Sequence, residues 1–214
     1  MKYLIVCGGN IEQEFACEVI KKSGIDVIIA ADCGMDFLYQ NGITPDIIVG
    51  DFDSTKTKAL EYFVEKGQSE IHTLNPVKDD TDTEFAIRTA MERGARNIVM
   101  IGATGSRIDH VLGNISLLGV GLKNDVSIEI LDPNNRIRMI DGSVTLKKDK
   151  QYGKYISLIP VSSDNEVSLT GFKYTLDHHV FDKYTSLGIS NEITDDEAVI
   201  DIHKGTFIMV ESRD

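Results

Sequence analysis

Short apolar runs alternate with amphipathic stretches from Met1 to about Leu131. The apolar runs predict β-strands at Tyr3–Val6, Val27–Ala30, Ile47–Val49, Ile71–Leu74, Ile98–Ile101 and Ile128–Leu131. Because each run is apolar at consecutive positions, both faces of each strand should be buried, which is typical of a parallel sheet covered by helices. The first part of the chain is therefore predicted to be an α/β domain with a mostly parallel sheet.

Apolar residues at helical spacing predict the helices that cover this sheet. They form two stripes, Ala59, Leu60, Phe63 and Val64 in one and Val111, Leu112, Ile115, Leu118 and Leu122 in the other. We interpret both stripes as core packing. Ser54 is a good N-cap residue, and Thr81 with Glu84 has the pattern of a capping box. The capping box should open a helix that contains Phe85 and Met91.

The pattern changes after Asp132-Pro133-Asn134-Asn135. Short runs predict strands at Arg136–Ile140, Val144–Leu146, Tyr155–Ile159, Val167–Leu169, Ala198–Ile202 and Thr206–Val210. These runs often alternate between apolar and polar residues, and Gly, Asp, Asn and Ser separate them, which is typical of an antiparallel sandwich or barrel. We therefore predict two domains, residues 1–132 and residues 133–214.

Composition and charge narrow the range of functions. The chain has a formal net charge of −12 and an isoelectric point near 4.8, so the clustered Lys and Arg that nucleic acids need are not expected. No segment approaches the ~18–20 apolar residues of a membrane span, and no membrane partner is expected. Cys7, Cys17 and Cys33 lack metal-site spacing. We expect them to be small buried side chains in a reducing cytoplasm.

Acidic residues follow three of the predicted strands. Asp32 comes after the second strand, Asp51 and Asp53 after the third, and Asp79, Asp80 and Asp82 after the fourth. The carboxyl ends of the strands of an open α/β sheet face one crevice, where ligands bind. Carboxylates held so close need a cation between them, and oxygen ligands together with phosphate favour Mg²⁺. We therefore predict a Mg–nucleotide site; the alternative is that these residues form only turns and helix caps.

A glycine-rich loop, Gly102–His110, separates a predicted strand from a predicted helix. It has neither the Gly-Lys-Ser/Thr of a P-loop nor a Rossmann fingerprint. Its backbone N–H groups and the Arg107 guanidinium can nevertheless bind phosphate oxygens. The alternative for Arg107 is a surface ion pair with Asp109.

Three segments, in this order and spacing, resemble one family. They are Gly50-Asp51-Phe52-Asp53-Ser54, Asp80-Thr81-Asp82 and Gly105-Ser106-Arg107-Ile108-Asp109-His110-Val111-Leu112-Gly113-Asn114, and they resemble bacterial thiamine pyrophosphokinase. The resemblance continues at residues 171–176 and 186–192, so it covers nearly the whole chain. It implies an α/β nucleotide-binding domain and a C-terminal antiparallel β-sandwich, in a homodimer with thiamine sites between subunits. It also implies that ATP donates its β,γ-pyrophosphoryl group to the thiamine hydroxyl and releases AMP.

The resemblance also implies residue roles. Asp51, Asp53 and Asp82 would hold Mg²⁺ and act in catalysis with Arg107; Asp32, Thr81, Arg107, Asp109 and Asn114 would line the ATP site; and Tyr174, Ser190 and Asn191 would contact thiamine. Two positions depart from the family pattern. Family members often carry Trp where Tyr174 stands, and small residues are more usual than Cys33-Gly34-Met35 after Asp32.

Three other interpretations remain open. Residues 51–55 also match the Asp-x-Asp-x-Thr motif of haloacid-dehalogenase-type phosphatases, although that family places the motif on its first strand and two predicted strands precede it here. The acceptor could be another alcohol, such as a hydroxymethylpterin, because the acidic motifs concern only the donor. The chain could also be a nucleotide-binding sensor without activity, although its full set of acidic residues argues against this.

Overall fold

The computed structural model describes residues 1–52, 58–74, 81–105 and 107–214. The chain divides into two compact units, Met1–Pro133 (unit 1) and Asn134–Asp214 (unit 2). Within the described ranges, no helix is long and apolar enough to cross a bilayer. Each unit is described separately below.

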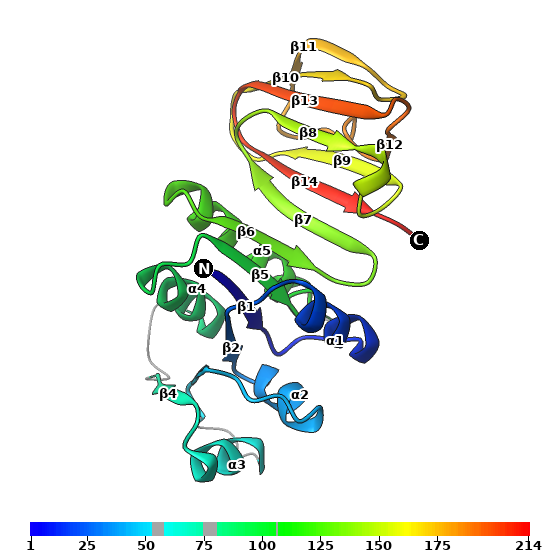
Figure 1. Ribbon diagram of the computed structural model, residues 1–214. Helices are drawn as coiled ribbons and strands as arrows, with labels where there is room; N and C mark the ends of the chain where they lie inside the picture. Colours follow the sequence, from blue (N-terminus) through cyan, green and yellow to red (C-terminus); the bar gives the residue numbers. More distant parts are fainter. Residues whose placement is uncertain (53–57, 75–80, 106) are drawn as a thin grey trace. The chain divides into compact units, whose positions relative to one another are not determined.

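Unit 1 is built on a parallel sheet (Figure 1). Its strands are β1 (Lys2–Val6), β2 (Val27–Ala31), β3 (Ile47–Gly50), β4 (Glu70–Thr73), β5 (Asn97–Ile101) and β6 (Ser127–Leu131). They lie in the order β6-β5-β1-β2-β3-β4, and each neighbouring pair is parallel. Consecutive residues of β1 and β3 are buried, which confirms the predicted two-sided burial and the α/β class.

Helices connect the strands of this sheet (Figure 1). They are α1 (Gln13–Lys22), α2 (Gly34–Gln40), α3 (Lys58–Lys66), α4 (Asp82–Glu92) and α5 (Ile108–Lys123). Helix α2 packs on β2, α4 packs on β1, β2 and β3, and α5 packs on β6. The chain runs outward from β1 to β4 and then returns to β5 on the other side of β1. This reversal of strand order is the position where open α/β sheets bind ligands.

The predicted helix stripes are buried only in part. Ala59 and Phe63 of α3 are buried, but Val64 is 56% exposed, and in α5 Leu118 is buried while Leu112 is 60% exposed. The prediction of core packing is therefore wrong for Val64 and Leu112. Helix α5 carries apolar residues around most of its surface, so their spacing does not define the face that meets the sheet.

The close contact of α5 with the sheet is made through a glycine. A Cβ at Gly121 would lie 2.6 Å from Cγ1 of Ile128 in β6, so a larger side chain would push the helix away from the strand. The predicted cap of α4 is confirmed, because Oγ1 of Thr81 accepts a hydrogen bond of 3.2 Å from the N–H of Glu84. The predicted N-cap Ser54 lies outside the described residues.

Unit 2 is an antiparallel β-sandwich, as the predicted fold class requires. Its strands are β7 (Asn135–Ile140), β8 (Val144–Lys147), β9 (Tyr155–Pro160), β10 (Asn165–Thr170), β11 (Leu176–Phe181), β12 (Asn191–Glu192), β13 (Glu197–Lys204) and β14 (Phe207–Ser212), with a 3₁₀ turn at Lys148–Lys150. One layer has the order β12-β9-β14-β7 and the other β11-β10-β13-β8. Leu158 and Met209 of the first layer and Val167 and Ile200 of the second belong to the same buried core.

Candidate functional site

The loops that follow β1 and β5 are joined at the carboxyl edge of the unit 1 sheet. The Cys7 N–H donates to the Ile101 carbonyl and the Gly9 N–H to the Gly102 carbonyl, both at 2.9 Å. A Cβ at Gly9 would lie 2.4 Å from the Gly102 oxygen, and a Cβ at Gly105 would lie 3.4 Å from Cα of Gly9. Glycine therefore allows these two backbones to approach each other where the strand order reverses.

Asp32 lies at the same edge, immediately after β2. Its N–H donates to the Val49 carbonyl of β3 at 2.8 Å, and a Cβ at Gly8 would lie 3.6 Å from its Oδ2. Asp32 also has a left-handed backbone with φ 51°, which is uncommon for a residue other than glycine. Asp32, which was predicted to line the ATP site, is thus held between the ends of β1 and β3, in a backbone conformation that often marks functional sites.

Asp51 directly follows β3, and Phe52 after it has a left-handed backbone conformation. Phe52 has φ 50°, and a Cβ at Gly50 would lie 2.7 Å from Cε1 of its ring. The ring therefore occupies the space that a side chain at position 50 would need. Asp51 is half-buried. Asp53, the other predicted metal ligand of this motif, lies outside the described residues.

The N-terminus of α4 brings a second predicted metal ligand to this edge. Oγ1 of Thr83 lies 3.9 Å from Sγ of Cys7, just beyond the end of β1. Asp82 is the first residue of α4, one position before Thr83, and is half-buried. Thr81 caps the helix. The free N–H groups of a helix start favour anions, so Thr81 and Asp82 lie where a phosphate can bind. Asp79 and Asp80 lie outside the described residues.

Arg107 and Asp109 lie at the start of α5 and form an ion pair. Nη2 of Arg107 is 2.5 Å from Oδ2 of Asp109, and both side chains are mostly exposed. The hydrogen bond from Arg107 lowers the pKa of Asp109 to about 2. Asn114, five residues after Asp109 in α5, donates from Nδ2 to the Ala103 carbonyl at 2.8 Å. Asn114 therefore ties the glycine-rich loop to the helix, and Arg107 projects from the end of that loop.

Two cysteines lie beside these residues but do not have the properties of nucleophiles. Burial raises the pKa of the Cys7 thiol to about 12. Partial desolvation and the neighbouring Asp32 carboxylate raise the pKa of Cys33 to about 11. Both thiols are protonated at neutral pH. The prediction of a buried side chain holds for Cys7 and is wrong for Cys33, which is exposed.

Unit 2 contains an apolar pocket of about 240 Å³. It is lined by Ile156, Leu158, Leu169, Phe172, Tyr174, Leu176, Leu187, Gly188, Ile189, Asn191 and Ile200. The predicted residues Tyr174 and Asn191 are thus both in its wall. Ser190, between two of the lining residues, has a left-handed backbone with φ 60°, and its N–H donates to Oγ of Ser157 at 3.0 Å.

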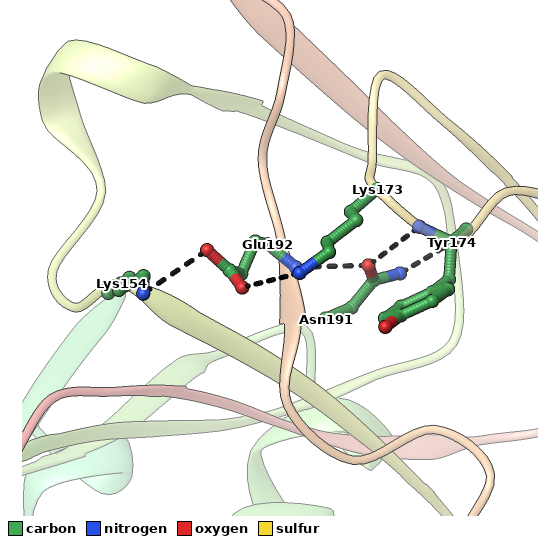
Figure 2. Close-up of polar contacts among 5 residues, drawn as sticks. All are labelled: Lys154, Lys173, Tyr174, Asn191 and Glu192. Atoms are coloured by element: carbon green, nitrogen blue, oxygen red, sulfur yellow. Dashed lines mark hydrogen bonds and ion pairs between the residues drawn. The ribbon is translucent and has the colours of Figure 1, made fainter.

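Sequence reasoning missed most of the pocket wall. Leu187 and Ile189 lie on either side of Gly188, and this apolar–Gly–apolar pattern is the signal that could have indicated a lining segment. It also missed Lys154 and Glu192, whose ion pair of 3.3 Å joins two separate segments near Tyr174 (Figure 2). That contact depends on strand pairing, which the local sequence does not reveal.

Comparisons with known proteins agree with this geometry. Residues 19–130 match the family model described as thiamin pyrophosphokinase, catalytic domain, and residues 143–207 match thiamin pyrophosphokinase, vitamin B1 binding domain. Thiamine pyrophosphokinase from Bacillus subtilis strain 168 is 38% identical over 188 residues, 87% of each chain.

Solved structures give the same result over the whole chain. The crystal structure of the Bacillus subtilis enzyme aligns with a TM-score of 0.87 and 32% identity, covering 100% of both chains. The structure of thiamin pyrophosphokinase from Geobacillus thermodenitrificans aligns with a TM-score of 0.85 and 31% identity, covering 100% of this chain and 98% of that one. The chain therefore belongs to the thiamine pyrophosphokinase family and is an enzyme that pyrophosphorylates thiamine.

Proposed function

We propose that the carboxyl edge of the unit 1 sheet binds ATP with Mg²⁺, and that unit 2 binds thiamine as the acceptor. The observation that carries the proposal is the series of contacts at this edge. Asp32 contacts the end of β3 and lies beside Gly8, Thr83 contacts Cys7, and Gly9 contacts Gly102. These contacts gather the ends of several strands and the start of α4 into one place, as a nucleotide site requires.

The donor set at this edge fits Mg²⁺. Asp51 and Asp82 offer carboxylate oxygens from two different elements, and oxygen ligands suit a hard divalent ion. Among the described residues, no group of three or more His, Cys, Asp or Glu side chains is arranged to hold a metal. Two carboxylates with the remaining positions taken by phosphate oxygens and water are a typical Mg²⁺ environment. Asp53, outside the described residues, is the third proposed ligand. Bound Mg²⁺ would neutralise charge on the phosphate oxygens.

The residues around the glycine-lined loops would hold the rest of ATP. Backbone N–H groups of the loops and of the α4 start can donate to phosphate oxygens. Arg107 would bind two phosphate oxygens with its planar guanidinium, while Asn114 keeps the loop in place through Ala103. Asp32, Thr81 and Asp109 complete the proposed nucleotide site.

The reaction depends mainly on positioning and charge. The thiamine hydroxyl oxygen forms a bond to the β-phosphorus of ATP, the bond from this phosphorus to the bridging oxygen of the α-phosphate breaks, and AMP leaves. A carboxylate at the sheet edge takes the hydroxyl proton. Arg107 stabilises charge on the transferred group, because phosphoryl transfer needs alignment and charge neutralisation more than covalent help.

The apolar pocket of unit 2 would hold thiamine. Its aromatic and aliphatic wall suits the two flat rings of thiamine, and Tyr174 offers a ring for stacking. Ser190 and Asn191 are the proposed polar residues of this site. Leu187, Ile189 and Tyr174 expose large apolar surfaces at the pocket, and we propose that a second copy of the chain covers them in a homodimer.

One assay tests the proposed function. The protein is incubated with ATP, Mg²⁺ and thiamine, and AMP and thiamine diphosphate are quantified. Equal amounts of the two products are expected, with no turnover when a hydroxymethylpterin replaces thiamine. Release of inorganic phosphate through an aspartyl-phosphate would instead indicate the phosphatase chemistry that the Asp-x-Asp-x-Thr pattern allows. Light scattering at the assay concentration tests the dimer, and an active monomer would contradict it.

A further inference from the structure

The side chain of Asn191 is committed to contacts within the protein. It is 8% exposed. Its Oδ1 accepts hydrogen bonds of 3.0 Å from the N–H groups of Tyr174 and Glu192, and its Nδ2 donates to the Tyr174 carbonyl at 2.8 Å (Figure 2). An amide oxygen has two lone pairs and both are used here, so only one N–H of the amide is left for any other contact.

The segment that contains Tyr174 and the segment that contains Asn191 are joined at further points. The Lys173 N–H donates to the Glu192 carbonyl at 2.9 Å, and Phe172 pairs with Ile193 through a β-bridge. The Glu192 carboxylate lies 3.2 Å from Nζ of Lys173 and 3.3 Å from Nζ of Lys154, and these contacts lower its pKa (Figure 2). Residues 172–174 are therefore attached to residues 191–193 by backbone and side-chain contacts.

Tyr174 is fixed mainly through its backbone. Tyr174 is 62% exposed, although it lines the pocket, and Nζ of Lys173 lies 5.6 Å from the ring centroid. Few neighbours can hold such an exposed ring, so its direction depends on the peptide to which it is attached. Asn191 contacts both the N–H and the carbonyl of Tyr174, which sets the position of that residue.

We propose that Asn191 is a positioning residue, which acts on thiamine through Tyr174 by holding the Tyr174 backbone so that its ring faces the pocket. This inference rests on the proposed function of the pocket as the thiamine site. It assigns Asn191 a different role from direct contact with thiamine, because its hydrogen-bonding groups are largely used by Tyr174 and Glu192.

A double-mutant cycle tests the inference in the full-length enzyme. Asn191→Ala should raise the KM for thiamine about tenfold, the equivalent of losing one or two net hydrogen bonds, while kcat and the KM for ATP stay unchanged. Tyr174→Ala should raise the same KM. In the Tyr174→Ala background, Asn191→Ala should cause no further rise, because two residues that act through one contact are not additive.

Asn165→Ala is the matched control. Asn165 is also a buried asparagine of unit 2, and its Nδ2 donates to the Ser162 carbonyl at 2.8 Å, away from the pocket wall. This variant should lose stability as Asn191→Ala does but keep the wild-type KM for thiamine. An equal rise of KM in Asn165→Ala would show that general destabilisation explains the effect and would overturn the inference.

The remaining outcomes also decide the question. If Asn191→Ala raises the KM equally with and without the Tyr174 ring, Asn191 contacts thiamine directly and the inference is wrong. It is equally wrong if Asn191→Ala leaves the KM unchanged while Tyr174→Ala raises it. If Tyr174→Ala leaves the KM unchanged, the proposed thiamine site itself fails, and the role of Asn191 fails with it.

A spectroscopic measurement follows the ring itself. The chain has no Trp, so Tyr174→Trp gives one indole, whose fluorescence anisotropy reports the mobility of the side chain. Adding Asn191→Ala to this variant should lower the anisotropy, whereas adding Asn165→Ala should not. Unchanged anisotropy after loss of the Asn191 amide would overturn the inference.

Discussion

Arg107 contacts Asp109 at two points, with Nη2 2.5 Å from Oδ2 and Nε 3.2 Å from Oδ1. The guanidinium therefore already presents the planar pair of donors that a phosphate group needs. Because both side chains are mostly exposed, this ion pair contributes little to stability, and a phosphate can replace the carboxylate at small cost. The surface pair and the proposed phosphate-binding role of Arg107 are thus compatible, the first in the free protein and the second with ATP bound.

Arg107→Lys should lower turnover by about 10²-fold or more, because a lysine keeps the charge but loses the two-point geometry at the transferred group. The measurement is kcat with saturating ATP, Mg²⁺ and thiamine. Arg96→Lys is the control, since Arg96 lies just before β5, at the other end of the strand that leads to this loop. A wild-type kcat for Arg107→Lys would show that Arg107 forms the ion pair with Asp109 but does not act on the transferred group.

Asp51→Asn should leave the metal-free fold intact or more stable, because it removes one of several carboxylates that repel each other. In the wild type, Mg–ATP should raise the melting temperature, because a ligand that binds only the folded state stabilises it. Asp51→Asn should show a much smaller rise. The melting temperatures are measured by calorimetry at equal Mg–ATP concentration. If Mg–ATP raises the melting temperature equally in both proteins, Asp51 is not a metal ligand.

The contact between Glu166 and His178 should make the stability of the fold depend on pH. Oε1 of Glu166 lies 2.7 Å from Nδ1 of His178, and this contact raises the pKa of His178 and lowers that of Glu166. The His178 contribution is complete below its unfolded pKa of about 6.5 and is lost as the pH rises through the higher folded pKa. The Glu166 contribution is present above its unfolded pKa of about 4.3 and is lost as the pH falls through the lower folded value.

The pair should therefore stabilise the fold most between about pH 4.5 and 6.5. The melting temperature of His178→Gln should fall furthest below the wild-type value near pH 5.5 and approach it at pH 8.5. His179→Gln is the control, because His179 is the next histidine of the same strand and its ring contacts the apolar ring of Phe181. A difference between His178→Gln and wild type that is the same at both pH values would exclude this linkage.

Loss of the Glu211 carboxylate should strongly destabilise unit 2. Its side chain is 1% exposed and accepts hydrogen bonds from Nη2 of Arg138 at 2.8 Å and from the Tyr152 N–H at 3.0 Å. Removing one member of a buried ion pair costs roughly 3–5 kcal/mol, so Glu211→Ala should lower the free energy of unfolding by about that amount. Urea denaturation measures it.

The control for Glu211 is a carboxylate in an exposed pair. Glu197 is 55% exposed and lies 3.3 Å from Nζ of Lys147. Glu197→Ala should cost less than about 1 kcal/mol, because exposed ion pairs contribute little. Equal losses in the two variants would show that burial of the Glu211 pair is not what makes it important.

The strands of unit 1 could be predicted because burial on both faces requires consecutive apolar residues. Three of the elements that were not predicted lack that signal. Helix α2 has only seven residues and begins at a glycine, and strand β12 has two residues. Strand β11 contains two histidines and an aspartate, and most of its residues are not buried, so its apolar pattern is weak. Where a short or exposed element forms depends on the segments that it pairs with, and the local sequence does not show which segments these are.

The position of Asp32, Asp51 and Asp82 could be predicted because strand ends share one edge, but the backbone geometry there could not. The left-handed conformations of Asp32 and Phe52 depend on the neighbouring strands and on the space at Gly50. In unit 2, Tyr174 and Asn191 were marked by the resemblance, but the hydrogen bonds between them join residues 17 positions apart. Only the folded pairing of these segments reveals which residue holds the other.

The most direct test of the proposed Mg²⁺ site is turnover as a function of Mg²⁺ concentration in wild type, Asp51→Asn and Asp46→Asn. Asp46 is the matched control, because it lies just before β3 and accepts a hydrogen bond of 2.7 Å from the Ile28 N–H, which an asparagine oxygen can also accept. Asp46→Asn should follow the wild-type curve. Asp51→Asn should be slower by about 10²-fold or more at limiting Mg²⁺, since it loses a ligand of the ion that neutralises the phosphates. A wild-type rate for Asp51→Asn at limiting Mg²⁺ would contradict the proposed site.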